Sequence, residues 1–114
     1  RMTMTAGEYQ KLCRYTLTPE CNNLNYLTLG LTSESGEVAG KVKKQIRGDY
    51  GSAIDRYTDR FKIDTLLEVG DALWYLTMIC DYFGVSLESV MEANIKKLRG
   101  RKQNGTIKGD GDDR

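Results

Sequence analysis

The chain has 114 residues, which suits one compact domain, and 39% of them are hydrophobic, enough for one modest core. Its 17 lysine and arginine residues nearly balance 16 aspartate and glutamate residues, which argues against a general nucleic-acid or membrane-surface binder. The sequence contains no histidine, which excludes Ser-His-Asp and Cys-His catalytic machinery and the HExxH zinc motif.

The first half of the chain predicts two helices. Thr5 and Glu8 have the spacing of a capping box, so we expect a first helix over residues 5–17. Pro19 then breaks the chain. Asn22 or Asn23 is a suitable N-cap for a long second helix over residues 23–46, followed by a loop over residues 47–52.

The second half predicts two more helices and a tail. Residues 53–60 are polar and give no clear periodicity, and a third helix is expected over residues 64–83, ended by Gly84. Ser86 is a suitable N-cap for a fourth helix that reaches residue 99. We expect a helical domain over residues 1–102 and a Gly- and Asp-rich tail or flap over residues 103–114. Because no segment alternates convincingly, the fold class is all-α.

Helical periodicity predicts one apolar stripe on each of the two long helices. On the second helix it consists of Leu24, Leu31, Val38, Val42 and Ile46, and on the third of Leu66, Leu73, Leu76, Cys80 and Phe83. Packing the two helices through these stripes would bring the acidic residues beside them to one edge of the core.

Two short acidic pairs are the strongest chemical signal in the sequence. Glu34 and Glu37 on the second helix, and Glu68 and Asp71 on the third, each stand three residues apart and therefore share a helix face. A single pair of this kind lies more often on a solvent-exposed helix face than in a metal site. Two pairs beside apolar residues, interrupted by helix-disfavouring glycines at 36, 40 and 70, favour a cage of oxygen ligands for hard divalent cations. Zinc is disfavoured because histidine and clustered cysteine are absent.

The flanking residues supply candidate substrate contacts, each with an ordinary alternative. Asn94, Lys97 and Arg101 share one face of the fourth helix, and the spacing alone fits a polar helix face equally well. Trp74 and Tyr75 follow Asp71 closely and suit the stacking of a nucleobase, although core packing is the commoner role of a tryptophan in such a helix. Tyr26 is a further candidate for the same pocket.

At these residues the chain resembles the MazG-type all-α nucleoside triphosphate pyrophosphohydrolases. The family's ExxE and ExxD motifs stand here as Glu34-Ser-Gly-Glu37 and Glu68-Val-Gly-Asp71, within LGLTSESGEVAGKVKK and EVGDALWYL. NIKKLRGR is similar to the family's N-x-x-K-L-x-x-R stretch, and the resemblance covers roughly residues 8–102. Ser35, where alanine is common, is a small departure. The tail ending in GDDR resembles small single-domain members, including phage-encoded ones.

The resemblance implies a four-helix-type bundle that assembles as a homodimer or homotetramer. It implies hydrolysis of a (deoxy)nucleoside triphosphate to a monophosphate and pyrophosphate, dependent on two or more Mg²⁺ ions, with Mn²⁺ as a substitute. The four acids become metal ligands and catalytic groups, with Glu34 expected to orient the attacking water. Lys97 and Arg101 would bind phosphates, and Asn94 phosphate or sugar. The role would be nucleotide-pool control or house-cleaning, with a dGTP-like purine among the candidate substrates.

Two readings from other classes remain open. One is a non-catalytic helical oligomerisation module whose acids hold a structural divalent cation, and the other is an acidic-faced bundle that binds a partner without metal. An enzyme needs Lys97, Arg101 and an aromatic side chain around the acids, whereas the oligomerisation module needs only the acids.

The remaining features favour the cytoplasm of a bacterial or phage-infected cell, with no membrane and no nucleic-acid partner. No apolar run approaches the ~18 residues of a membrane span, and we expect no signal peptide before the first helix. Arg1 is an unusual first residue, so we expect Met2 or Met4 to be the initiator. Three widely spaced cysteines are typical of reduced thiols.

Overall fold

The computed structural model describes residues 3–51 and 57–114, and these residues form helices and turns without a strand. The helices are α1 (Ala6–Arg14), the 3₁₀ turn η1 (Pro19–Cys21), α2 (Leu24–Arg47), α3 (Asp59–Tyr82) and α4 (Leu87–Gln103). The all-α prediction is therefore confirmed. In the part of the chain that the structure describes, no helix combines the length and the apolar character needed to cross a membrane.

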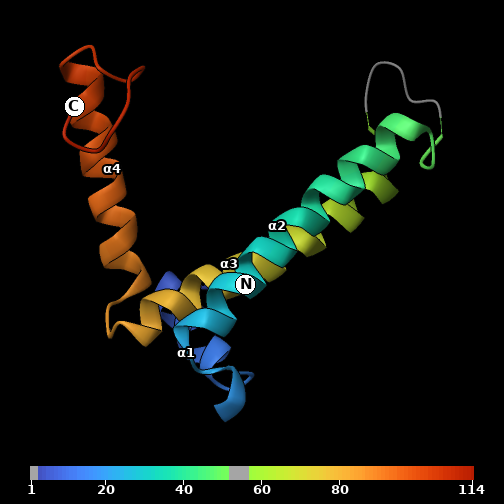
Figure 1. Ribbon diagram of the computed structural model, residues 1–114, viewed down its shortest axis with the longest axis horizontal. Coiled ribbons are helices and arrows are strands. Elements are labelled where there is room, and N and C mark those ends of the chain that lie inside the picture. Colours follow the sequence, from blue (N-terminus) through green and yellow to red (C-terminus); the bar gives the residue numbers. More distant parts are fainter. Residues whose placement is uncertain (1–2, 52–56) are drawn as a thin grey trace.

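The helices form two arms that diverge from a common junction (Figure 1). α2 and α3 lie side by side and run in opposite directions, and together they make one long arm. α1 packs against the end of α3 at the junction, and α4 leaves the junction as the second arm. Among the described residues, no helix packs along most of α4, and α2 and α3 cover each other on one side only.

The predicted N-caps are confirmed, while several helix ends differ from the prediction. Thr5 and Glu8 form the complete capping box of α1, and the side chain of Asn23 accepts a hydrogen bond from the Tyr26 amide at 2.8 Å. Ser86 caps α4 by accepting from the Ser89 amide at 3.1 Å. α1 ends at Arg14, before residue 17, because the chain turns there into a short connector.

The third helix begins five residues before its expected start, and the fourth continues to Gln103. Thr58 supplies the unrecognised N-cap of α3, where its hydroxyl oxygen accepts from the Phe61 amide at 3.2 Å. The loop prediction over 47–52 agrees with the turn that follows Gly48, whose φ of +93° is the left-handed conformation that glycine favours. Residues 52–56, which include the first half of the ambiguous segment 53–60, lie outside the described residues.

The core is small and lies at the junction. Cys13, Leu27 and Met78 are buried there, from α1, α2 and α3 respectively. Five partly buried side chains pack around them: Tyr9, Leu17, Trp74, Tyr75 and Ile79. The core therefore holds the end of α3 and its aromatic residues against the start of α2.

Most of the predicted apolar stripe does not face this core. Cys80 is buried, but Ile46, Leu66 and Phe83 are 82%, 64% and 61% exposed. A hairpin of two helices covers only one side of each helix, and periodicity does not say which side. The Cα radius of gyration is 17.4 Å, whereas a compact domain of about 100 residues has ~13 Å. The chain thus leaves a large apolar area uncovered.

A buried glutamine joins α1 to the start of α4. The Gln10 side-chain nitrogen donates to the Val85 carbonyl at 3.0 Å and to Asp81 Oδ1 at 3.2 Å. Its oxygen accepts from the backbone amide of Leu87, the first residue of α4, at 2.8 Å. Arg14 adds an ion pair to Asp81 at 2.6 Å. These contacts fix α1 on the end of α3 and thereby place the connector that follows α1.

The tail folds back along the end of α4. Arg101 is buried, and its guanidinium donates to the Gly111 carbonyl at 3.3 Å and to Asp112 at 2.9 Å. The Arg114 guanidinium donates to the carbonyls of Thr106, Gly111 and Ile107. The residues that follow Gln103 therefore fold back against the end of α4.

Candidate metal centre

Three of the four predicted acids converge between the two long helices. Glu34 of α2 and Glu68 and Asp71 of α3 each offer a carboxylate oxygen, and these oxygens all lie within 4.8 Å of one another. The side-by-side packing of α2 and α3 is what brings them together. Glu37 is exposed and stands outside this group, although its charge still acts on Glu34.

The acidic group is electrostatically unfavourable in the absence of a cation. Partial burial raises the pKa of Glu34, and the neighbouring carboxylates of Asp71 and Glu68 raise it further. Among the described residues, no lysine or arginine forms a salt bridge with any of the three acids. A set of closely spaced carboxylate oxygens without a counter-charge from the protein fits a hard divalent cation such as Mg²⁺.

A hollow of about 360 Å³ opens beside the carboxylates. Its lining consists of Thr16, Glu34, Asp71, Trp74 and Tyr75. The two ring centroids of Trp74 and Tyr75 are 4.9 Å apart with the planes at 83°. The hollow therefore combines negatively charged oxygens on one side with aromatic surface on another, and both predicted aromatic residues line it.

Each aromatic side chain is held by a residue that the sequence did not single out. Tyr75 lies against α2 at Gly30, where a Cβ atom would come within 2.1 Å of the tyrosine ring. The Trp74 indole nitrogen donates to the Thr16 hydroxyl at 2.7 Å. Neither Gly30 nor Thr16 belongs to a sequence motif. Their roles become visible only because α3 packs against them.

The glycines that the sequence did single out do not serve packing within the chain. A Cβ atom at Gly36, Gly40 or Gly70 would meet no atom of the described residues within 4 Å. Glycines at these positions indicate either close packing or the approach of a ligand, and within the described residues the structure shows no close packing at them. The open space over them is compatible with the approach of a ligand or of another subunit.

The predicted phosphate-binding residues lie on the other arm. Lys97 and Arg101 are on the outer half of α4, which Figure 1 shows leaving the junction away from α2 and α3. Both bind the tail: Asp112 Oδ1 is 3.2 Å from Lys97 Nζ and 2.9 Å from an Arg101 nitrogen. These two cations lower the pKa of Asp112. Asn94 lines a separate hollow of about 480 Å³ with Lys97. The single chain does not bring these side chains to its own acids.

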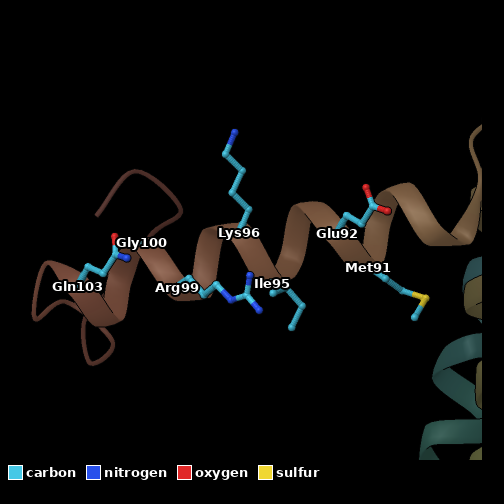
Figure 2. A pocket seen from close by; sticks show the side chains of 7 residues that line it. All are labelled: Met91, Glu92, Ile95, Lys96, Arg99, Gly100 and Gln103. Atoms are coloured by element: carbon cyan, nitrogen blue, oxygen red, sulfur yellow. The ribbon is translucent and has the colours of Figure 1, made fainter.

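A further hollow, of about 650 Å³, runs along α4 and is lined by this one helix (Figure 2). Its lining residues are Met91, Glu92, Ile95, Lys96, Arg99, Gly100 and Gln103. Figure 2 shows Glu92 and Lys96 on the opposite side of the helix from Met91. Since one helix alone lines it, this hollow is an open flank of α4 with mixed polar and apolar side chains and not an enclosed ligand site.

The chain is similar to proteins of one known family. Residues 22–106 match the family model described as the MazG nucleotide pyrophosphohydrolase domain. The chain is 40% identical over 91 residues to the Gene 37 protein of Mycobacterium phage L5, an alignment that covers 80% of this chain and 76% of that protein. No solved structure matches the chain. The matched range contains all four acids and the predicted substrate-binding residues of α3 and α4, whereas α1 and Thr16 precede it. The chain therefore belongs to the MazG nucleotide pyrophosphohydrolase family.

Proposed function

We propose that the protein hydrolyses a (deoxy)nucleoside triphosphate to the monophosphate and pyrophosphate in a reaction that depends on a divalent cation. The observation that carries the proposal is the meeting of Glu34, Glu68 and Asp71 within 4.8 Å beside a hollow lined by aromatic side chains. Membership of the MazG family supports the same reaction class.

The acids have distinct roles in this proposal. Glu34, Glu37, Glu68 and Asp71 would hold two or more Mg²⁺ ions, with Mn²⁺ as a substitute. The bound cation supplies charge neutralisation for the phosphate oxygens and lowers the pKa of a coordinated water. Glu34 would also orient the attacking water, because its carboxylate lines the hollow and lies beside Glu68 and Asp71.

A second copy of the chain completes the site in this account. The single chain leaves much of its apolar surface exposed, including Leu66 and Leu67 on α3 and Met91 and Ile95 on α4. A homodimer or homotetramer would cover this surface. It would also allow Lys97, Arg101 and Asn94 of one copy to reach the phosphates held at the acids of another.

The aromatic side chains serve the nucleoside end of the substrate. Trp74 and Tyr75 line the hollow next to the acids, and the Tyr26 ring lies 6.5 Å from that of Tyr75. Base stacking on such rings tolerates different bases, so a dGTP-like purine is one candidate within a wider class. The corresponding role is control of the nucleotide pool in the cytoplasm of a bacterial or phage-infected cell.

The experiment is a panel of nucleoside triphosphates, assayed for pyrophosphate release with Mg²⁺, Mn²⁺ or EDTA. Glu68→Gln keeps the size of the side chain but removes a ligand charge, and we expect turnover to fall by about 10²–10³-fold with the fold retained. Glu20→Gln, at an exposed glutamate of η1, is the matched control and should retain full activity. Near-normal turnover of Glu68→Gln would refute the assignment of the acids.

One observation favours an alternative, a helical oligomerisation module with a structural cation. In the single chain, Lys97 and Arg101 form salt bridges with Asp112 of the tail and do not lie near the acids of α2 and α3. This alternative predicts that wild-type protein turns over no nucleotide of the panel. It also predicts that Glu68→Gln changes the oligomeric state measured by light scattering.

A further inference from the structure

A hydrogen-bonded chain of three groups fixes the position of Trp74. The indole nitrogen of Trp74 donates to Thr16 Oγ1 at 2.7 Å, and the same hydroxyl donates to the carbonyl of Cys13 at 2.8 Å. The hydroxyl is thus both acceptor and donor, and its rotation is set by the end of α1. α1 itself is fixed on α3 by Gln10 and Arg14.

Thr16 and Trp74 stand between two hollows. On one side is the hollow of about 360 Å³ that also contains Glu34 and Asp71. On the other side is an apolar hollow of about 270 Å³, lined by Met4, Tyr9, Leu12 and Cys13 together with Thr16 and Trp74. Thr16 and Trp74 therefore line both hollows and separate them. Their hydrogen bond holds the indole ring in its position between the two.

We propose that Thr16 is a positioning residue that determines nucleobase selectivity. It holds the Trp74 indole as a fixed wall of the carboxylate-containing hollow and so limits the size of the base that stacks there. This inference rests on the proposed function, which places the nucleoside at Trp74 and Tyr75. Thr16 lies before residues 22–106, the range that matches the family model.

The physical consequence of losing the bond follows from the two hollows. Without an acceptor at residue 16, the indole N–H must find water, and the ring gains room to tilt toward the apolar hollow. The hollow beside the acids then widens, and the stacking surface is no longer preorganised. Binding of the preferred base weakens, while a base that fitted poorly gains space. The ratio of affinities for different bases therefore falls.

The experiment uses Thr16→Val, which keeps the shape of the side chain but removes the hydroxyl, and Thr16→Ser, which restores it. Trp74 is the only tryptophan of the chain, so intrinsic fluorescence reports this one ring. The probes are non-hydrolysable α,β-imido analogues of dGTP and dUTP, titrated with Mg²⁺ into the 114-residue chain. Thr32→Val is the matched control, since the Thr32 hydroxyl donates to the Thr28 carbonyl of its own helix at 3.2 Å and not to another helix of the described residues.

In the wild type we expect both analogues to alter the Trp74 emission, with unequal Kd. Thr16→Val should shift the emission of the free protein and weaken the preferred analogue by about 3- to 10-fold, the loss of one hydrogen bond. The Kd ratio of the two analogues should move toward one. In steady state, KM should rise with kcat nearly unchanged. Thr16→Ser should restore the wild-type emission, Kd ratio and KM, and Thr32→Val should keep all three.

Two failures are distinguishable. If the wild type hydrolyses nucleotides but Thr16→Val leaves both Kd values unchanged, the inference is wrong while the proposed function stands. If no analogue binds to the wild type and no nucleotide is hydrolysed, the proposed function itself fails and the inference falls with it.

Discussion

Replacing Gly30 by alanine tests whether the Tyr75 ring occupies the position that the structure gives it. The Cβ atom that the substitution adds would lie 2.1 Å from Cε1 and 2.3 Å from Cζ of Tyr75. Carbon atoms in contact prefer about 3.5 Å, so the ring edge must move by roughly 1.4 Å or α2 and α3 must separate. Either movement disturbs the wall of the carboxylate-containing hollow.

The magnitude follows from two opposing effects. Overpacking of this kind costs about 1–3 kcal/mol, whereas alanine is about 1 kcal/mol more favourable than glycine inside a helix. Gly40→Ala in the same helix isolates the second effect, because a Cβ atom there would meet nothing within 4 Å. We therefore expect Gly40→Ala to stabilise the protein and Gly30→Ala to be about 1–3 kcal/mol less stable than Gly40→Ala.

Urea unfolding of both variants, followed by Trp74 fluorescence, measures this difference directly. Gly30→Ala should also raise KM for nucleotide, because Tyr75 is displaced into the hollow. If Gly30→Ala stabilises the protein as much as Gly40→Ala does, then Tyr75 does not lie against Gly30, and the described wall of the hollow is wrong.

Three further predictions concern the charged groups. First, Mg²⁺ at about 100 Kd should stabilise the wild type by about 2.7 kcal/mol relative to EDTA, and scanning calorimetry of Glu68→Gln should show a much smaller difference; equal melting temperatures of the wild type with and without Mg²⁺ would contradict a cation site. Second, the pKa of Glu34 is raised above its ordinary 4.5, so the metal-free protein should lose stability as pH rises from 4.5 through that raised pKa. Glu34→Gln should remove this part of the slope, and an identical pH profile for the two proteins would count against the raised pKa. Third, Asp112→Asn should tighten binding of inorganic pyrophosphate up to about fivefold by releasing Lys97 and Arg101. Asp113→Asn is its control, and calorimetric titration showing unchanged affinity for Asp112→Asn would mean that the tail does not compete at these residues.

The features that the sequence predicted well are local or periodic. The caps at Thr5, Asn23 and Ser86 depend on residues within a few positions of each other, and all three are present. Glu68 and Asp71 share a face because of helical spacing, and the packing of α2 on α3 then adds Glu34. Glu37 has the same three-residue spacing from Glu34, but its carboxylate does not join the group formed by Glu34, Glu68 and Asp71.

The features that the sequence could not predict depend on contacts between distant segments. Thr16 and Trp74 are 58 positions apart, and no spacing rule links a threonine in a connector to an indole on another helix. Gly30 matters and Gly36 does not, because only Gly30 lies under a ring from α3. Periodicity likewise shows which residues share a helix face but not which element packs on that face. Leu66 and Ile46 therefore belong to predicted core stripes and are nevertheless exposed.

Hydrolysis of a nucleoside triphosphate in ¹⁸O-labelled water, with Mg²⁺ and followed by mass spectrometry, is the most direct test of the central claim. The proposed reaction attacks the α-phosphorus, so the label should enter the monophosphate and the released pyrophosphate should remain unlabelled. Label in free orthophosphate, with a nucleoside diphosphate as the other product, would show attack at the γ-phosphorus and would contradict the proposed function.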